Sequence, residues 1–224
     1  MAMTADGKIA TANRAVSTFG SQRDHEHLLE LRATADAVMA GAATVNAAPI
    51  NLGPGALKFR RRRLKTGLAE YNLRVIVSGS GSLDPDAEIF REKISPVIVL
   101  TTRRASGKKL NRLRAVADEV TICGKTEINF RAALRWLRTH WNVRRLLCEG
   151  GGELNDALFR AGLVDEVHLT ICPIIFGGRN APTIAEGIGF QRLAKAQGFQ
   201  IQRIKRVENE LFTMFTLQKL RLAK

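Results

Sequence analysis

A glutamate followed by three glycines is the part of this sequence best suited to chemistry. The apolar run Leu146–Cys148 ends at Glu149, and Gly150–Gly152 follow before a segment of helical character. Glycines lack a Cβ atom, so the chain can turn sharply and a ligand can approach the backbone N–H groups. With the positive end of a helix at Glu153–Asn155, these donors would suit a pyrophosphate, although a tight turn without a ligand would use the same glycines. The spacing fits neither the dinucleotide-binding G-x-G-x-x-G pattern nor a Walker loop.

A second glycine turn lies earlier in the chain. The strand-like segment Asp36–Ala40 runs into Gly41, and small residues with a threonine, Thr44, follow. In an open α/β sheet, ligands gather beyond the carboxyl ends of the strands, where both glycine turns would lie. The Thr44 hydroxyl could bind a cofactor or cap a short helix, and the local sequence fits both.

The chain has a formal net charge of +14, which implies a negatively charged partner. Its densest basic stretch, Lys58–Lys65, follows the loop-like Asn51–Gly55 and could be a solvated basic loop or a contact for phosphate groups. A nucleic-acid-binding module is the alternative from a different functional class. However, aromatic residues make up only 6% of the chain and the single tyrosine, Tyr71, is not interleaved with the basic stretch, so platforms for base stacking are scarce. We therefore expect a phosphorylated small molecule rather than a nucleic acid.

Apolar and helical segments alternate along the chain and would position these motifs. Short strands with little alternation, separated by helices, predict an α/β fold with a mostly parallel central sheet flanked by helices. The expected strands are Asp36–Ala40, Leu73–Ser78, Pro96–Thr101, Glu119–Cys123 and Arg144–Glu149. The expected helices are Ser106–Ala117, Thr126–Thr139 and Glu153–Ala161, with another after Ser21–Asp24, whose spacing is that of a capping box.

The C-terminal part has a different pattern. The strand-like segments Val167–Ile175, Phe199–Val207 and Leu211–Leu217 have no helix between the last two. Only Glu208–Glu210 separates those two, which predicts a C-terminal antiparallel hairpin. Neither an internal repeat nor a clear linker is present, so we expect a single domain over residues 1–224.

The cysteine pattern and the apolar runs indicate a cytoplasmic protein. Cys123, Cys148 and Cys172 lie far apart within apolar stretches, which fits buried reduced thiols better than disulfides or a metal site. No apolar run approaches the roughly 20 residues of a membrane-spanning helix, and no secretory signal opens the chain.

Several motifs in order carry a resemblance to a known family. They are Met3–Ala10 (MTADGKIA), Leu31–Val38 (LRATADAV), Gly41–Val45, Glu149–Asn155, Ala161–Glu166 (AGLVDE) and Ile175–Gly178. Together they resemble the reductase domain of the riboflavin-pathway deaminase/reductase family, over nearly the whole chain. The resemblance implies a dihydrofolate-reductase-like fold and NADPH-dependent reduction of the ribosyl group of a phosphorylated ribosylaminopyrimidine to a ribityl chain.

The resemblance also implies roles for individual residues. Lys8 and Glu149 would be catalytic, with Lys8 orienting the ribose hydroxyls or balancing charge and Glu149 binding the pyrimidine or the opening ribosylamine. Ser17, Arg32 and Glu149 would contact the substrate, whereas without the resemblance Arg32 reads as a helix-surface residue. The positions that would bind NADPH are Gly41, Thr44, Gly150, Gly151, Gly152 and Leu154.

The sequence departs from the family pattern after Thr44. Ala48 stands where the family usually has an acidic residue, so one contact is absent or supplied elsewhere, and the cluster Arg60–Arg63 could supply phosphate binding. A related reductase of a pterin or another heterocycle therefore stays an alternative. His25–His27 has no cysteine partners of the zinc-deaminase type, so we expect the reductase in a stand-alone form without a metal. The pyrimidine could be aminated or deaminated.

The apolar C-terminal hairpin predicts a homodimer, which the family resemblance also suggests. Its apolar residues lie on more than one face, and core packing would use only some of them. They are Phe199, Ile201, Ile204, Leu211, Phe212, Met214 and Phe215.

Overall fold

The computed structural model describes residues 1–14 and 18–218, which divide into two units. One unit is continuous and runs from His25 to Gly151. The other joins the described residues of Met1–Asp24 to those of Gly152–Lys224. Each unit has its own sheet, and the two are described separately below.

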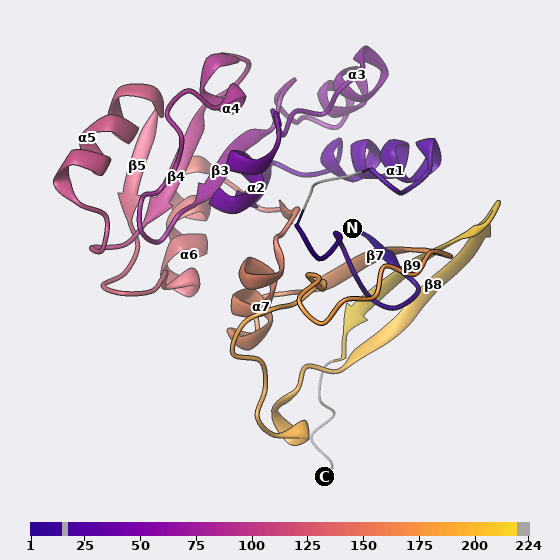
Figure 1. Ribbon diagram of the computed structural model, residues 1–224. Helices are drawn as coiled ribbons and strands as arrows, with labels where there is room; N and C mark the ends of the chain where they lie inside the picture. Colours follow the sequence, from indigo (N-terminus) through magenta and orange to yellow (C-terminus); the bar gives the residue numbers. More distant parts are fainter. Residues whose placement is uncertain (15–17, 219–224) are drawn as a thin grey trace, which may run out of the picture. The chain divides into compact units, whose positions relative to one another are not determined.

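The predicted parallel sheet forms the centre of the continuous unit (Figure 1). Its strand order is β5-β4-β3-β2-β6, and every neighbouring pair is parallel. All five predicted strands are confirmed within one or two residues of the predicted ends. Their bounds are β2 Ala37–Gly41, β3 Leu73–Val77, β4 Val97–Thr101, β5 Glu119–Ile122 and β6 Leu146–Cys148.

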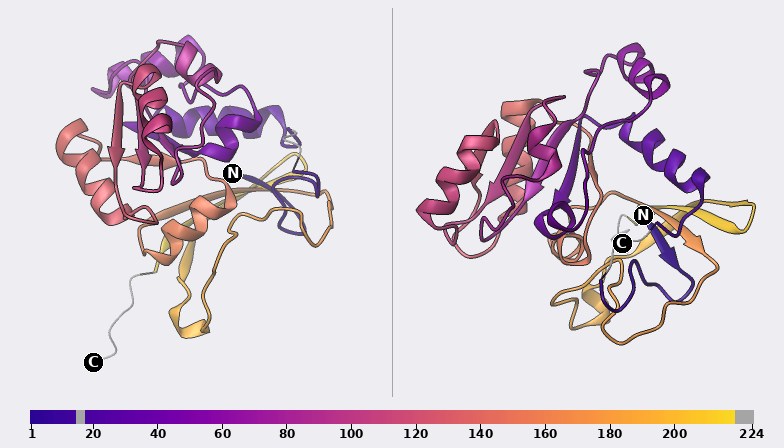
Figure 2. Two further views of the ribbon diagram at one scale, coloured as in Figure 1. Left: turned by 60° about the vertical axis from the view of Figure 1, so that its left-hand side comes forward. Right: turned by 45° about the horizontal axis from the view of Figure 1, so that its top comes forward.

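Helices lie on both sides of this sheet (Figure 2). Their bounds are α1 Gln22–Arg32, α2 Ala42–Ala47, α3 Leu57–Lys65, α4 Glu88–Arg91, α5 Gly107–Val116 and α6 Phe130–Trp141. Helix α6 begins at Phe130 rather than at the predicted Thr126, because the Asn129 side chain caps it by accepting a hydrogen bond from the amide of Ala132. The Ser21 hydroxyl accepts from the amide of Asp24, as the capping box predicts.

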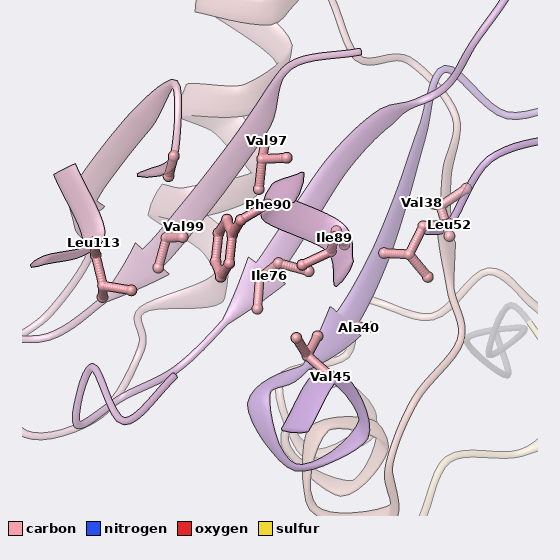
Figure 3. Close-up of a cluster of buried hydrophobic side chains, with 11 residues drawn as sticks. Val38, Ala40, Val45, Leu52, Ile76, Ile89, Phe90, Val97, Val99 and Leu113 are labelled. Atoms are coloured by element: carbon pink, nitrogen blue, oxygen red, sulfur yellow. The ribbon is translucent and has the colours of Figure 1, made fainter. Parts of the chain in front are cut away.

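Alternate side chains of the central strands form one apolar cluster with the helices on that face (Figure 3). Val38, Ile76 and Val99 come from three neighbouring strands, and Phe90 and Leu113 come from α4 and α5. Each such side chain stabilises the fold by about 1.5–3 kcal/mol when fully buried. This cluster fixes β2, whose carboxyl end carries one of the two glycine turns.

The basic stretch Lys58–Lys65 lies in helix α3, so the first of its two alternatives, a solvated loop, is wrong. Phe59 and Arg63 are four residues apart and both are buried, so they share the inner face of α3. Arg63 is fully buried and all its hydrogen bonds go to backbone carbonyls, so it cannot meet a phosphate group. Arg60 pairs with Glu70, whereas Arg61 and Arg62 are exposed.

The second unit contains a four-stranded sheet with the order β1-β7-β9-β8. Its strands are β1 Ala2–Thr4, β7 Glu166–Cys172, β8 Phe199–Val207 and β9 Glu210–Leu217, and its helix α7 spans Gly152–Arg160. The predicted hairpin is confirmed, since Val207 pairs with Glu210 and β8 runs antiparallel to β9. Strand β7 ends at Cys172, earlier than predicted, because Pro173 has no N–H to continue the ladder. The short strand β1 was not predicted from the sequence.

Two further expectations concern thiols and membranes. The three cysteines are thiols. Cys123 and Cys172 are buried, as predicted, whereas Cys148 is only half-buried. Within residues 1–14 and 18–218, no helix has the length and apolar character that a membrane crossing requires.

Candidate active site

Glu149 lies at the carboxyl end of strand β6, where its backbone continues the pairing with β2. Its amide donates to the carbonyl of Met39 at 2.8 Å. The side chain of Glu149 is 13% exposed, so the rigid parallel sheet presents a largely buried carboxylate. This is the position at which ligands meet an open α/β sheet.

Arg32, the last residue of α1, holds that carboxylate. Its Nε donates to Glu149 Oε1 at 2.5 Å and its Nη2 donates to Oε2 at 2.6 Å, while Nη1 donates to the carbonyl of Gly53 at 2.8 Å. The Arg32 side chain is 12% exposed, so the alternative of a helix-surface residue is wrong. The two parallel bonds fix the plane of the carboxylate, and each oxygen keeps a lone pair that can accept a hydrogen bond from a substrate N–H or O–H.

The two glycine turns, far apart in the sequence, lie side by side. Gly41 ends β2, and its amide donates to the carbonyl of Gly150 at 3.3 Å. Gly150 has φ +78° and Gly151 has φ +98°, both in the left-handed region that favours glycine. A Cβ atom at Gly151 would lie 3.7 Å from the Thr44 hydroxyl oxygen. The turns therefore leave the backbone open where other residues would place side chains.

Thr44 lies inside α2 and does not cap it. The cap position is Gly41, and no side chain caps this helix. The capping alternative for Thr44 is therefore wrong, and its hydroxyl lies beside Gly151.

Lys8 belongs to the other unit, in the loop that follows β1. The Thr4 hydroxyl accepts from the Lys8 amide at 2.9 Å, and the Lys8 ammonium donates to the carbonyl of Ala181 at 3.2 Å. The side chain of Asp6 braces the same loop by accepting from the Thr4 hydroxyl and from the amide of Gly177. These hydrogen bonds, of which the one from Thr4 has the largest effect, hold the pKa of the Asp6 carboxyl below its usual value despite some desolvation. Sequence reasoning missed Asp6 as a brace.

Helix α7 begins at Gly152, one residue before the predicted start. A Cβ atom at Gly152 would lie 2.7 Å from Cγ of Glu186 and 2.8 Å from the carbonyl oxygen of Thr183, so this position requires glycine. The Leu154 side chain is 7% exposed and packs in the core of its unit. A ligand could therefore meet Leu154 only through its backbone amide, which is one of the free N–H groups of a first helical turn.

The other predicted positions divide as follows. Ser17 lies outside the described residues. The continuous unit brings together Glu149, Arg32, Gly41, Thr44, Gly150 and Gly151, whereas Lys8, Gly152 and Leu154 belong to the second unit. Among the described side chains, no group of three or more His, Cys, Asp or Glu residues could hold a metal ion.

Cys148 directly precedes Glu149 but is not suited to act as a nucleophile. Burial, opposed in part by the Gly150 amide and assisted by the Glu149 carboxylate, raises the pKa of its thiol to about 12. A thiol with this pKa is neutral at physiological pH, and the thiolate is the reactive form.

Comparison with known proteins identifies the family. The profile of the RibD C-terminal domain matches residues 1–212. The 2,5-diamino-6-ribosylamino-4(3H)-pyrimidinone 5′-phosphate reductase of Archaeoglobus fulgidus is 33% identical over 91% of this chain and 91% of its own length. The reductase of the same name from Methanothermobacter thermautotrophicus is 30% identical over 97% of this chain and 95% of its own length.

Solved structures agree in fold. A pyrimidine reductase-like protein from Corynebacterium diphtheriae has a TM-score of 0.79 and 21% identity, covering 97% of this chain and 90% of its own. Acinetobacter baumannii RibD has a TM-score of 0.74 and 19% identity, covering 97% of this chain and 56% of its own. The predicted fold class and the predicted oxidoreductase class are thus confirmed. The chain belongs to the RibD C-terminal domain family, the riboflavin-pathway reductases that its motifs resemble.

Proposed function

We propose that this protein uses NADPH to reduce the ribosyl group of a 2,5-diamino-6-ribosylaminopyrimidinone 5′-phosphate to a ribityl group. The choice of the aminated substrate is supported by the name that three relatives share. These relatives are 33%, 30% and 27% identical to this chain over most of its length. The relatives named RibD are 30%, 24% and 24% identical, and this chain covers only 50%, 53% and 54% of their length.

The paired carboxylate supports a substrate role for Glu149. Arg32 fixes both oxygens by hydrogen bonds of 2.5 and 2.6 Å, so the carboxylate presents its remaining lone pairs in one plane. Amino groups on a pyrimidine are donors that such an acceptor binds, and a fixed acceptor loses little entropy on binding. Glu149 would thus orient the heterocycle, and Arg32 would keep the carboxylate in place.

Lys8 would act on the sugar. Its ammonium has three donors, of which the carbonyl of Ala181 uses one at 3.2 Å. The remaining donors could bind ribose hydroxyls and stabilise the oxygen that gains charge as the ribosylamine opens.

The glycine turns fit a nicotinamide dinucleotide. Gly150 and Gly151 have positive φ values, and the place where a Cβ of Gly151 would stand is beside the Thr44 hydroxyl. Backbone N–H groups there would hold the pyrophosphate, and Thr44 would donate a further hydrogen bond. When bound, NADPH supplies the hydride that reduces C1′ of the ribosylamine.

The function is tested by NADPH oxidation, followed as loss of nicotinamide absorbance. The diaminated substrate and its deaminated counterpart are assayed in parallel, with NADH as a second cofactor. We expect turnover with NADPH and the diaminated compound, and a loss of at least about 100-fold in kcat/KM for Glu149→Ala and Lys8→Ala. Glu26→Ala, which removes the solvent-exposed pair with Lys58, is the control. Turnover of the deaminated compound alone would refute the substrate, and turnover of neither compound would refute the function.

We also propose a cytoplasmic homodimer that associates through the C-terminal hairpin. Ile201, Ile204 and Leu211 are 61%, 57% and 40% exposed on β8 and β9, and apolar residues clustered on a strand pair are typical of an interface. Cysteines kept as thiols suit a reducing compartment. Sedimentation at micromolar concentration tests the dimer: Ile204→Lys should shift the protein to monomer, and a wild-type monomer would refute the idea.

A further inference from the structure

A fully buried arginine lies behind the Arg32–Glu149 pair. Arg63, on the inner face of α3, has no exposed surface. Its Nε donates to the carbonyl of Ala69 at 2.8 Å, and its Nη1 donates to the carbonyls of Arg32 at 2.8 Å and Ala35 at 2.6 Å. Burial lowers the pKa of Arg63, and nearby Asp36 partly offsets this effect. A buried cation is costly, so its retention here calls for a role.

A second buried side chain converges on the same two carbonyls. Asn72, which precedes β3 and is also fully buried, donates through Nδ2 to the carbonyls of Arg32 and Ala35, at 2.7 Å each. Arg63 and Asn72 come from different elements, yet both hold the point where α1 ends and the chain turns towards β2.

Without these two side chains the turn would be held weakly. The last carbonyls of a helix have no partner within the helix, and here the carbonyl of Arg32 otherwise accepts from the amide of Ala35 at 3.3 Å. The cation of Arg63 also lies at the negative end of the α1 dipole, where positive charge is favourable. The clamp formed by Arg63 and Asn72 therefore keeps the backbone of Arg32 in a single conformation.

The side chain of Arg32 extends from this clamped backbone to Glu149. Both of its hydrogen bonds to Glu149 need the planar guanidinium to face the carboxylate, so a small rotation at the end of α1 would break one of them. Glu149 itself is fixed by its amide bond to Met39 on the sheet. The orientation of the carboxylate thus depends on the end of α1 staying in place.

We propose that Arg63 and Asn72 are positioning residues for the reductase site: by holding the carbonyls of Arg32 and Ala35, they keep the Arg32 guanidinium in bidentate contact with Glu149. This inference rests on the proposed role of Glu149 in substrate binding. Arg63 belongs to the most basic stretch of the sequence, and the role proposed for it is structural and does not require phosphate binding.

The chain provides a matched control in Arg74. It is also fully buried, and its guanidinium also donates only to backbone carbonyls, those of Ile89 and Ser95. Burial lowers its pKa as well. Arg74 hydrogen-bonds to neither Arg32 nor Glu149, so its substitution should affect stability without affecting the site.

The test compares Arg63→Lys and Asn72→Ala with Arg74→Lys at a temperature where circular dichroism shows all variants folded. We expect kcat/KM for the diaminated substrate to fall at least about tenfold in the first two and less than about threefold in the control, with the Kd for NADPH within about twofold of wild type. A drop in Arg74→Lys equal to that of Arg63→Lys and Asn72→Ala would overturn the proposal. If Arg63→Lys does not fold, Asn72→Ala carries the comparison.

A second readout needs no substrate. The Arg32 Nε–H group, bonded to Glu149, should give a slowly exchanging signal in a ¹⁵N–¹H NMR spectrum, assigned by its loss in Arg32→Lys. We expect this proton to exchange at least about tenfold faster in Arg63→Lys and Asn72→Ala and at the wild-type rate in Arg74→Lys. Unchanged exchange in all three would overturn the proposal. If wild-type protein shows no reductase activity but the exchange follows this pattern, the proposed function fails while the clamp stands.

Discussion

Replacing Arg32 with methionine should strongly destabilise the unit that contains the glutamate site. The substitution keeps an unbranched chain of similar reach but removes the two bonds to Glu149 and the bond to Gly53. Glu149 is 13% exposed and would remain as a carboxylate without its cation. Removing one partner of a buried ion pair costs about 3–5 kcal/mol, and the small remaining exposure places this case near 3 kcal/mol. In a chain of this size, that corresponds to a fall in Tm of about 6–12 °C.

The assay is urea unfolding followed by tryptophan fluorescence. Trp136 and Trp141, the two tryptophans of the chain, both lie in α6, so the signal reports on the continuous unit. A double-mutant cycle with Glu149→Leu separates the pair energy from the loss of packing. The double variant has no unpaired charge, so we expect it to be more stable than either single variant, with a coupling energy of about 2 kcal/mol.

An exposed pair serves as the control for this cycle. Lys58 and Glu26 are joined at 2.7 Å but their side chains are 62% and 35% exposed, so Lys58→Met should cost less than about 1 kcal/mol. If Arg32→Met costs no more than Lys58→Met, or if the cycle with Glu149→Leu is additive, the description of a buried, energetically coupled pair is refuted.

Three further predictions concern other parts of the chain. Gly152→Ala should destabilise the start of α7 by about 1–3 kcal/mol, because the new Cβ would meet the carbonyl of Thr183 at 2.8 Å. Gly107→Ala is the control, because open space surrounds the position of its Cβ, and thermal melts of the two variants test the difference. Cys148 and Cys172, whose pKa values desolvation raises to about 12, should react with iodoacetamide at pH 8 roughly 100-fold slower in folded than in urea-unfolded protein; equal rates would contradict the raised pKa values. The pKa of Asp6 is lowered from 3.8 in the folded state, so its contribution to stability is present above that value and is lost as pH falls through the folded pKa. Asp6→Asn should therefore show a shallower fall in Tm below pH 4 than wild type, and parallel curves would argue against the brace.

Local patterns were sufficient for most elements of the fold. The five parallel strands were visible because each is a short apolar run, and the hairpin was visible because only Glu208–Glu210 interrupts two such runs. Helix α3 was missed because most of its residues are charged and only two, Phe59 and Arg63, are buried on its inner face, so the sequence shows no apolar periodicity. Strand β1 was missed because three residues carry too little pattern to distinguish a strand from a loop.

The sequence by itself determined the family, the glycine turns and the identity of the glutamate. Glycines and apolar runs act through local geometry, and the order of the motifs along the chain can be read directly from the sequence. Only the tertiary structure decided which groups meet. Without the family resemblance, Arg32 reads from sequence as a surface residue, yet its contact with Glu149 spans 117 positions of the chain. Arg63 reads as part of a solvated cluster, yet it is clamped to the end of α1 together with Asn72. Such contacts arise from the way strands and helices pack, and no local pattern encodes the partner of a buried charge.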